Sequence, residues 1–269
     1  MTSTVDMSYL PVEAAKFSPF LLFLPQTPSQ KNLILVPSPI AITTSSYRTL
    51  YRSVHASPEF CMMGFGPSWP PKNWSDKETG AWMRRCDVDK SWGPRGMGDF
   101  AIGLLPGKIE NAGREAGKSG LRILKEGEWK SFMEARGGEG LFLEGLEYVG
   151  YAGIRDATTT SLVSVGPPEI FPSYSEMIEL RYGIAPEHWG RGLARSAAEG
   201  VMEWGVFERG VRRYIAETEK TNVRSGRVLE KMGFQKLSTS YFQNESEFEW
   251  GLDAARFLDQ RKGKEPSEG

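Results

Sequence analysis

A glycine-containing loop in the last third of the chain has the residue types of an anion site. Gly190 and Gly192 lack side chains and Ala194 is small, so the backbone here can approach a ligand closely. A predicted helix follows, and the amide groups of its first turn have no intrahelical acceptor. These unpaired donors and the positive end of the helix dipole favour a phosphate or pyrophosphate. The alternative is a tight turn whose small residues serve packing alone.

Two common phosphate-binding motifs do not fit this loop. A P-loop requires Lys and then Ser or Thr after its last glycine, whereas Leu193 and Ala194 stand there. A dinucleotide fingerprint requires a third glycine near the start of a parallel sheet, whereas Arg195 follows Ala194. Too little chain remains after the loop to complete a six-stranded parallel sheet. Both families are therefore excluded.

The elements that must position the loop follow from the spacing of apolar residues. A strand is predicted over Glu176–Ile184, and a helix begins after Pro186 with one apolar face of Leu193, Ala197, Val201 and Trp204. The other predicted strands are Leu33–Val36, Asp99–Leu105, Leu146–Ile154, Tyr214–Thr218 and a closing hairpin of Phe234–Phe242 with Phe248–Leu252. The other predicted helices are Thr43–Ala56, Ser75–Cys86 and Val223–Met232.

The composition divides the chain into an arm, one domain and a tail. Four prolines within residues 1–30 disfavour a continuous helix or a central strand, so we expect an N-terminal arm, pinned through Phe20 to Leu24. One domain is expected over 31–255, and a charged tail over 256–269. Within the domain, three segments differ in residue composition from the predicted helices and strands. They predict insertions at 58–97, 106–145 and 157–175.

The charge and the cysteine content exclude several classes of protein. Among 269 residues, 33 Lys and Arg face 34 Asp and Glu, so the net charge of -1 gives no field for nucleic acid or anionic membranes. The apolar run Phe20–Leu24 is too short to span a bilayer and lacks a basic leader. We therefore expect a cytoplasmic protein, with the nucleus not excluded. With only Cys61, Cys86, His55 and His188 available, we expect no disulfide framework and no metal site.

Two spaced motifs resemble the GNAT acyltransferase superfamily. Its pyrophosphate loop reads Gln/Arg-x-x-Gly-x-Gly/Ala, and Trp-Gly-Arg-Gly-Leu-Ala stands at 189–194. The strand Glu-Leu-Arg-Tyr-Gly at 179–183 is similar to the ELGYW strand of the ribosomal-protein alanine N-acetyltransferase-like subgroup. Thr221–Lys236 resembles the N-x-x-S-x-R-V-L-E-K-x-G-F helix of that subgroup. The resemblance covers roughly 33–56 and 98–252 and implies a GNAT-like α/β fold: a mixed, mostly antiparallel twisted sheet of six to seven strands, flanked by about four helices.

The resemblance implies acetyl-coenzyme A as the cosubstrate. Backbone groups of the loop would hold its pyrophosphate, with the residues Trp189, Gly190, Arg191, Gly192, Leu193, Ala194 and Arg195. Ile184 and Ala185 would offer backbone groups to the pantetheine arm, because in this family the strand splays from its neighbour. Asn222 would hydrogen-bond the same arm, and its alternative role is that of an ordinary helix N-cap.

The catalytic assignments also come from the resemblance. Glu179 aligns with the strand carboxylate that could act as the base, with Glu176, Glu217 and Glu219 as further candidates. Ser225 matches the serine that returns a proton to the thiolate. Many superfamily members have a Tyr acid where Leu229 stands here, and Tyr241 is a weak substitute. His188 is expected to be a satisfied loop histidine.

The implied activity is acetylation of a primary amine by direct attack in a ternary complex. The acceptor is a small-molecule amine or a peptide N-terminus, and the Trp-rich insertion at 58–97 could cover a closed pocket. A different class of protein is a coenzyme A-binding regulatory or interaction protein without turnover. A third class is an interaction protein, in which the loop is structural and the aromatic insertion contacts a partner. The sequence leaves open whether the protein forms a homodimer.

Overall fold

The structure is a computed structural model of the whole chain, and it describes residues 18–24, 32–105, 113–117, 120–162 and 171–262. Within these ranges one sheet has ten strands in the order β4-β5-β1-β2-β3-β6-β7-β8-β10-β9. The strands are β1 (Phe20–Leu24), β2 (Leu33–Pro37), β3 (Asp99–Leu104), β4 (Arg114–Glu115), β5 (Arg122–Lys125), β6 (Glu147–Asp156), β7 (Ile178–Ile184), β8 (Arg213–Glu219), β9 (Gln235–Lys236) and β10 (Glu247–Asp253). Neighbouring strands are antiparallel, except that β7 and β8 run parallel.

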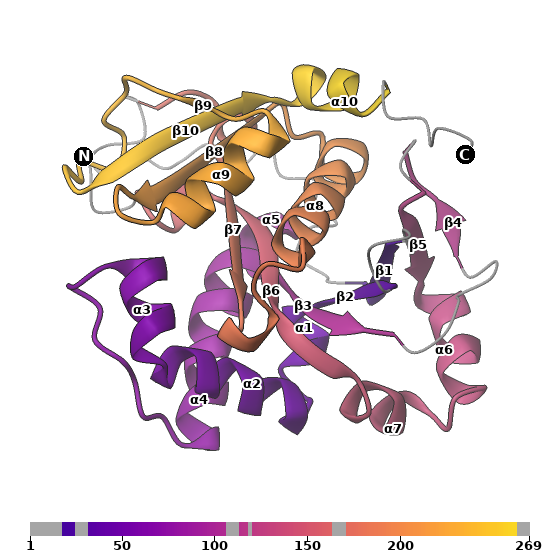
Figure 1. Cartoon of the computed structure of the whole chain (residues 1–269). Coiled ribbons are helices and arrows are strands. Elements are labelled where there is room, and N and C mark those ends of the chain that lie inside the picture. The colour runs from indigo at the N-terminus through magenta and orange to yellow at the C-terminus, as the bar shows by residue number, and fades with distance from the viewer. Residues whose placement is uncertain (1–17, 25–31, 106–112, 118–119, 163–170, 263–269) are drawn as a thin grey trace, which may run out of the picture.

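Helices cover both faces of this sheet (Figure 1). The α-helices are α1 (Ser38–Ala41), α2 (Ser45–Ala56), α3 (Pro58–Phe65), α4 (Asp76–Met83), α5 (Gly93–Arg95), α6 (Glu126–Glu134), α7 (Glu139–Glu144), α8 (Leu193–Arg209), α9 (Val223–Met232) and α10 (Ala254–Lys262). A π-helix, η3 (Arg84–Trp92), continues α4. Short 3-10 turns are η4 (Ala157–Thr159), η6 (Tyr174–Glu176) and η7 (Pro186–His188).

Side-chain alternation along the strands creates two cores. In β2, Leu33 and Leu35 pack in the core that α8 covers, whereas Ile34 and Val36 pack in the core beneath α1 and α2. The expected apolar face of α8 is confirmed, because Leu193, Ala197, Val201 and Trp204 are all buried. The α/β class and the mixed, mostly antiparallel sheet are also confirmed.

The strand count was too low, because segments expected to be an arm and an insertion add strands. Phe20–Leu24 is the interior strand β1, which pairs with β2 on one side and β5 on the other. Pro19 lies just before the strand and so removes none of its ladder bonds. The expectation that no central strand forms in this proline-rich segment is therefore wrong. Within the insertion at 106–145, β4 and β5 extend the sheet.

The chain also continues its secondary structure beyond the expected end. Ala254–Lys262 forms α10, and Phe257 is buried against the α8 core, with its ring 6.3 Å from that of Tyr214. The tail expected from residue 256 is therefore wrong as far as residue 262. In the closing hairpin, β10 forms as expected, but β9 has only two residues, Gln235 and Lys236.

The residues 58–95, which we call the cap, fold into α3, α4, η3 and α5. A capping box between Ser75 and Glu78 starts the predicted helix one residue after Ser75. Where the helix was expected to end at Cys86, the chain continues as η3 to Trp92. Most of the cap lies on the α2 side of the sheet (Figure 1), whereas its Trp92 packs in the α8 core, with its ring centre 5.9 Å from that of Trp204.

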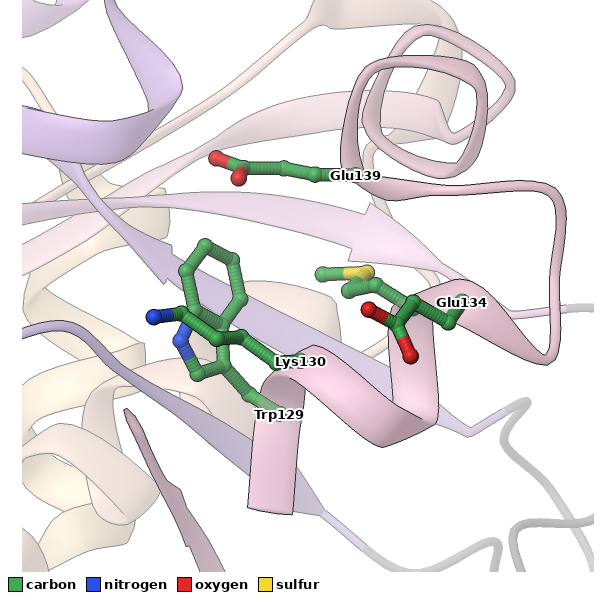
Figure 2. A pocket seen from close by; sticks show the side chains of 5 residues that line it. Trp129, Lys130, Glu134 and Glu139 are labelled. Atoms are coloured by element: carbon green, nitrogen blue, oxygen red, sulfur yellow. The ribbon is translucent and has the colours of Figure 1, made fainter. Parts of the chain in front are cut away.

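A hollow of about 150 Å³ lies at the other end of the sheet, between α6 and α7. Trp129, Lys130, Met133, Glu134 and Glu139 line it (Figure 2). None of these is a predicted site residue. In the part of the chain that the structure describes, no helix is both long and apolar enough to cross a membrane.

Candidate functional site

The parallel strands β7 and β8 separate after two residue pairs. They pair at Ile178 with Tyr214 and at Glu179 with Ile215, and no described strand continues the ladder along the rest of β7 on this side. The Ala185 N–H donates to Val149 on the β6 side at 2.9 Å. Because backbone groups alternate between the two neighbours of a strand, those of Tyr182 and Ile184 face the opening. The splay that the resemblance implied is thus present.

The glycine loop leads into α8 at the wide end of this opening. Gly190 and Gly192 have φ values of 77° and 76°, and a Cβ at either position would meet nothing within 4 Å. Ser196 donates to the Gly192 carbonyl at 3.1 Å, so the amides of Leu193, Ala194 and Arg195 precede the first helical bond. The ligand side of the loop is unobstructed, and its donors fit a pyrophosphate. Leu193 contributes only its backbone, because its side chain is buried.

Trp189 joins the glycine loop to the end of β7 by a hydrogen bond. Its indole N–H donates to the Ile184 carbonyl at 2.6 Å, and the Arg224 guanidinium lies 4.8 Å from its ring centre. The Ala185 carbonyl accepts from His188 at 2.9 Å. Three of the four backbone groups of Ile184 and Ala185 are therefore occupied. The structure corrects the expectation that both residues leave groups open, and only the Ile184 N–H faces the opening.

The two loop arginines differ in how strongly they are held. Arg191 is exposed and lies 3.3 Å from His188 Nδ1. Arg195 pairs with Glu199 one turn further along at 2.9 Å, and Arg261 binds the same carboxylate at 2.8 Å. Arg191 is thus the more available positive charge beside the loop.

At the start of α9, Asn222 uses both ends of its side-chain amide. Its Oδ1 accepts from the Ser225 N–H at 3.0 Å, which is the N-cap role, and its Nδ2 donates to the Met63 carbonyl at 2.6 Å. The N-cap role is confirmed, and the contact to pantetheine stays a prediction.

Ser225 is linked to β7 by a tyrosine that the sequence did not single out. The Tyr182 hydroxyl donates to the Ser225 carbonyl at 3.2 Å and lies 2.7 Å from Ser225 Oγ. Burial raises the pKa of Tyr182 well above its usual range, so it is a neutral phenol. Tyr182 lies three residues after Glu179 in the motif strand. Because side chains alternate along a strand, the sequence could have predicted that Tyr182 lies on the face opposite to Glu179. Leu229, where a Tyr acid was missing, is fully buried in the core.

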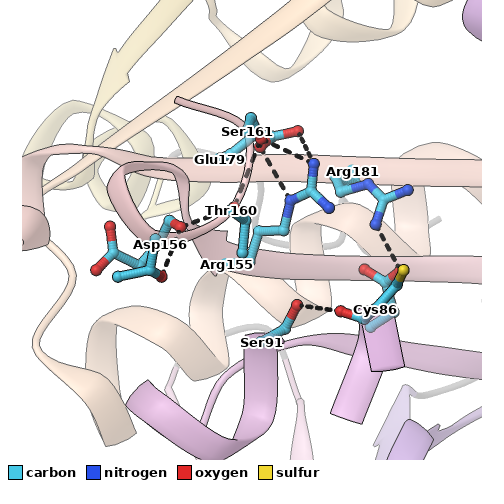
Figure 3. Close-up of polar contacts among 10 residues, drawn as sticks. Cys86, Ser91, Arg155, Asp156, Thr160, Ser161, Glu179 and Arg181 are labelled. Atoms are coloured by element: carbon cyan, nitrogen blue, oxygen red, sulfur yellow. Dashed lines mark hydrogen bonds and ion pairs between the residues drawn. The ribbon is translucent and has the colours of Figure 1, made fainter. Parts of the chain in front are cut away.

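Glu179 lies on the opposite face of β7, in a closed ion pair (Figure 3). Arg155 Nε and Nη2 each donate to its carboxylate at 3.0 Å, and the Ser161 hydroxyl donates to it as well. Burial raises the pKa of Glu179, but Arg155 outweighs burial and holds it below its usual value. Its oxygens are occupied and weakly basic.

Glu217, a second candidate for the base, has a different environment. It lies on β8 two residues beyond the last pair with β7. Burial, the Glu179 charge and a hydrogen bond to Glu247 raise the pKa of Glu217 to about 9. Glu219 is buried nearby and accepts from the Ser246 hydroxyl at 3.3 Å.

Glu176 and Tyr241 both lie outside this network. Glu176 lies in η6, before β7 begins. Tyr241 packs its ring 6.1 Å from that of Phe171, in a separate apolar cluster. Among the described residues, no group of three or more His, Cys, Asp or Glu side chains is placed to hold a metal ion.

The cap lies across the opening on the Glu179 face of β7. A Cβ at Gly183 would come within 2.7 Å of Phe60 in α3, so this strand and the cap are in close contact. Asn222 binds the Met63 carbonyl of the same helix, and Gly66 abuts the Glu219 side chain. The cap therefore contacts β7, β8 and the start of α9.

Part of the chain matches a known family model. Residues 125–235 match the family model described as an acetyltransferase (GNAT) domain. That segment contains β7, the glycine loop, α8, β8 and α9. The α/β fold is GNAT-like, as the resemblance implied. The ribosomal-protein alanine N-acetyltransferase-like subgroup stays a prediction.

Individual relatives share shorter segments or the fold alone. The chain is 41% identical over 58 residues to the uncharacterized N-acetyltransferase YoaA of Bacillus subtilis, which is 22% of this chain and 33% of that protein. It is 31% identical over 58 residues to the uncharacterized N-acetyltransferase p20 of Bacillus licheniformis, again 22% of this chain and 33% of the relative. The chain thus matches about a third of the length of each.

Among solved structures, an uncharacterized protein from Bacillus halodurans superposes with a TM-score of 0.53 at 12% identity, over 92% of this chain and 96% of the other. A domain from Methanocaldococcus jannaschii gives 0.50 at 14% identity, over 83% and 99%. At these identities, the two superpositions show a similar fold and nothing further.

Proposed function

We propose that the protein is an N-acetyltransferase that moves an acetyl group from acetyl-coenzyme A to a primary amine. One observation carries the proposal: two left-handed glycines lead into α8 at the open end of the β7–β8 gap. An anion site and a channel for an extended chain therefore lie next to each other. The match of this segment to the GNAT domain model supports the same conclusion.

In this proposal the cosubstrate supplies an activated acetyl thioester, and the chain binds it in two places. The amides of Leu193, Ala194 and Arg195 hold the pyrophosphate, with Arg191 adding charge. The N–H of Ile184 and the backbone of Tyr182 line the gap for the pantetheine arm.

Ser225 and Tyr182 form the proton-donating pair. The amine nitrogen attacks the thioester carbonyl carbon, the carbon–sulfur bond breaks, and the departing sulfur takes a proton. Ser225 Oγ supplies this proton and is reprotonated from solvent, while the neutral Tyr182 hydroxyl 2.7 Å away donates a hydrogen bond to the serine oxygen. This pair replaces the tyrosine acid that is absent at Leu229.

For the base, the geometry favours Glu217 over Glu179. Glu179 is saturated by Arg155 and Ser161. A carboxyl with a pKa of about 9 is closer to an alkyl ammonium, with a pKa of about 10.4, so moving the amine's proton to it costs less. Because of this raised pKa, Glu217 first releases its own proton to solvent, and the carboxylate formed then accepts the proton that the substrate ammonium gives up. Glu217→Gln should reduce kcat more than Glu179→Gln at equal folded fraction, and the reverse order would return the role to Glu179.

The cofactor half of the proposal is tested by calorimetric titration with acetyl-coenzyme A and, separately, with NADH. We expect one-site binding of acetyl-coenzyme A alone. Gly192→Val should abolish it, because the side chain projects into the ligand surface and a valine at a φ of 76° strains the loop, and a melting curve checks that the protein stays folded. Gly210→Ala, which also places a Cβ in open space but at the far end of α8, is the control. Unchanged affinity in Gly192→Val would remove the loop from the site.

A second candidate function is coenzyme A binding without turnover. The closed Glu179 ion pair and the buried Leu229 favour it. Tight binding of acetyl-coenzyme A with no transfer to a broad amine panel would establish this second function. A single domain, a cytoplasmic location and a homodimer are further proposals that rest on the sequence.

A further inference from the structure

A buried charged cluster continues beyond Glu179 along the cap side of β7. Arg181 Nη1 donates to Asp99 Oδ2 at 3.0 Å. The Asp99 carbonyl accepts from Ser38 Oγ at 2.8 Å and from the Trp92 indole at 3.1 Å, which fixes Asp99 at the start of β3. Asp99 is therefore held rigidly beneath the cap.

The cap contributes a second carboxylate to this cluster. Asp87 lies in the π-helix η3 and is 2% exposed. It accepts a hydrogen bond from the Tyr51 hydroxyl. Burial and the Asp99 charge raise the pKa of Asp87 to about 7, and Arg181 and Arg155 act in the opposite direction. π-helical segments are rare and frequently mark functional sites.

Three buried oxygens in this cluster have no hydrogen-bond partner among the described residues. They are Asp87 Oδ2, Asp99 Oδ1 and the Tyr47 hydroxyl. The Tyr47 ring centre lies 6.2 Å from that of Tyr51, which binds Asp87, and burial and the charges of Asp87 and Asp99 raise the pKa of Tyr47. Unpaired buried oxygens are unfavourable unless something binds them. Arg181 offsets only one of the two carboxylates, since Arg155 is bound to Glu179.

We propose that Asp87, Asp99 and Tyr47 bind a primary ammonium group that the acceptor carries in addition to its reacting amine. An ammonium has three N–H donors for the three oxygens, and its charge compensates the second carboxylate. An amine held there keeps its proton and is not the nucleophile, so the acceptor is a diamine or polyamine. This inference rests on the proposed function. Because the oxygens are enclosed, binding requires η3 to move away from α2.

The test is calorimetric titration with 1,4-diaminobutane, with 1,4-butanediol as a probe that lacks ammonium groups. We expect the diamine to bind saturably and the diol not to bind. Asp87→Asn, which keeps the shape and removes the charge, should weaken diamine binding about tenfold or more. Asp89→Asn is the matched control, because Asp89 is exposed on the same π-helix.

A melting curve without ligand separates binding from a structural role. At pH 8 Asp87→Asn should melt at a higher temperature than the unsubstituted protein, because it removes an uncompensated buried charge. A lower melting temperature would make Asp87 a structural partner of Arg181 and overturn the proposal. Absent diamine binding, or equal binding in Asp87→Asn, would also overturn it. Titrating the same samples with acetyl-coenzyme A tests the transferase function separately.

Discussion

The two faces of β7 carry different kinds of polar interaction. On the α9 face, Tyr182 and Ser225 are joined by hydrogen bonds between neutral groups. On the cap face, Glu179 and Arg181 belong to buried ion pairs with partners on β6 and β3. Neutral hydroxyls tolerate the loss of a partner, whereas a buried charge does not. We infer that the hydroxyls of the α9 face can donate protons during a reaction and that the ion pairs of the cap face hold their charges in fixed positions.

Removing a cation from the cap face should have the largest effect on stability. Arg155→Met leaves the Glu179 carboxylate buried without its partner, which should cost about 3–5 kcal/mol of unfolding free energy. Urea unfolding at pH 7 measures this loss. A cost no greater than that of a surface variant would show that the pair is screened by solvent.

On the α9 face, the larger effect should be on rate. Ser225→Ala should lower kcat about 100-fold, because the departing sulfur loses its proton donor, while the affinity for acetyl-coenzyme A changes little. Steady-state kinetics with separate titration of the cosubstrate measures both quantities. Tyr182→Phe should show a smaller decrease in kcat, and an unchanged kcat in both variants would remove the pair from the mechanism.

The cap face should also make stability depend on pH. The raised pKa values of Asp87, about 7, and Glu217, about 9, mean that the unfolded chain releases these protons more readily. Their contribution is complete below about pH 4 and is lost as the pH rises through about 7 and then about 9. Melting temperatures between pH 5 and pH 9 should therefore fall, and the double variant Asp87→Asn, Glu217→Gln should flatten the decline. A decline of the same size in the double variant would assign it to other groups.

The smallest effect is expected at the loop. Arg195→Gln breaks a partly exposed pair with Glu199, which should cost less than about 1 kcal/mol. Its unfolding curve provides the surface reference for Arg155→Met. A loss of several kcal/mol here would show that the Arg195, Glu199 and Arg261 network acts as a buried unit.

The sequence predicted the α9 face well, because its signals are local. The helix Val223–Met232 has the predicted bounds, and the apolar face of α8 is buried as expected. The cap face could not be predicted in the same way. Arg155 and Glu179 are 24 residues apart, and Asp99 and Arg181 are 82 apart, so no spacing rule connects them. A single carboxylate such as Asp87 on a π-helix gives no pattern at all, since this helix type has no sequence signature comparable to a cap or a heptad.

The position of β1 determines when the sheet can be completed during synthesis. Phe20 is among the first described residues, yet it pairs with Lys125, about a hundred residues later in the chain. Native contacts so distant in sequence close slowly, since the intervening chain must be ordered first. During translation β1 therefore leaves the ribosome with both of its edges unpaired, and its five apolar side chains stay exposed until β2 and then β5 have followed. A nascent chain arrested before residue 125 should consequently present an open strand edge that chaperones recognise.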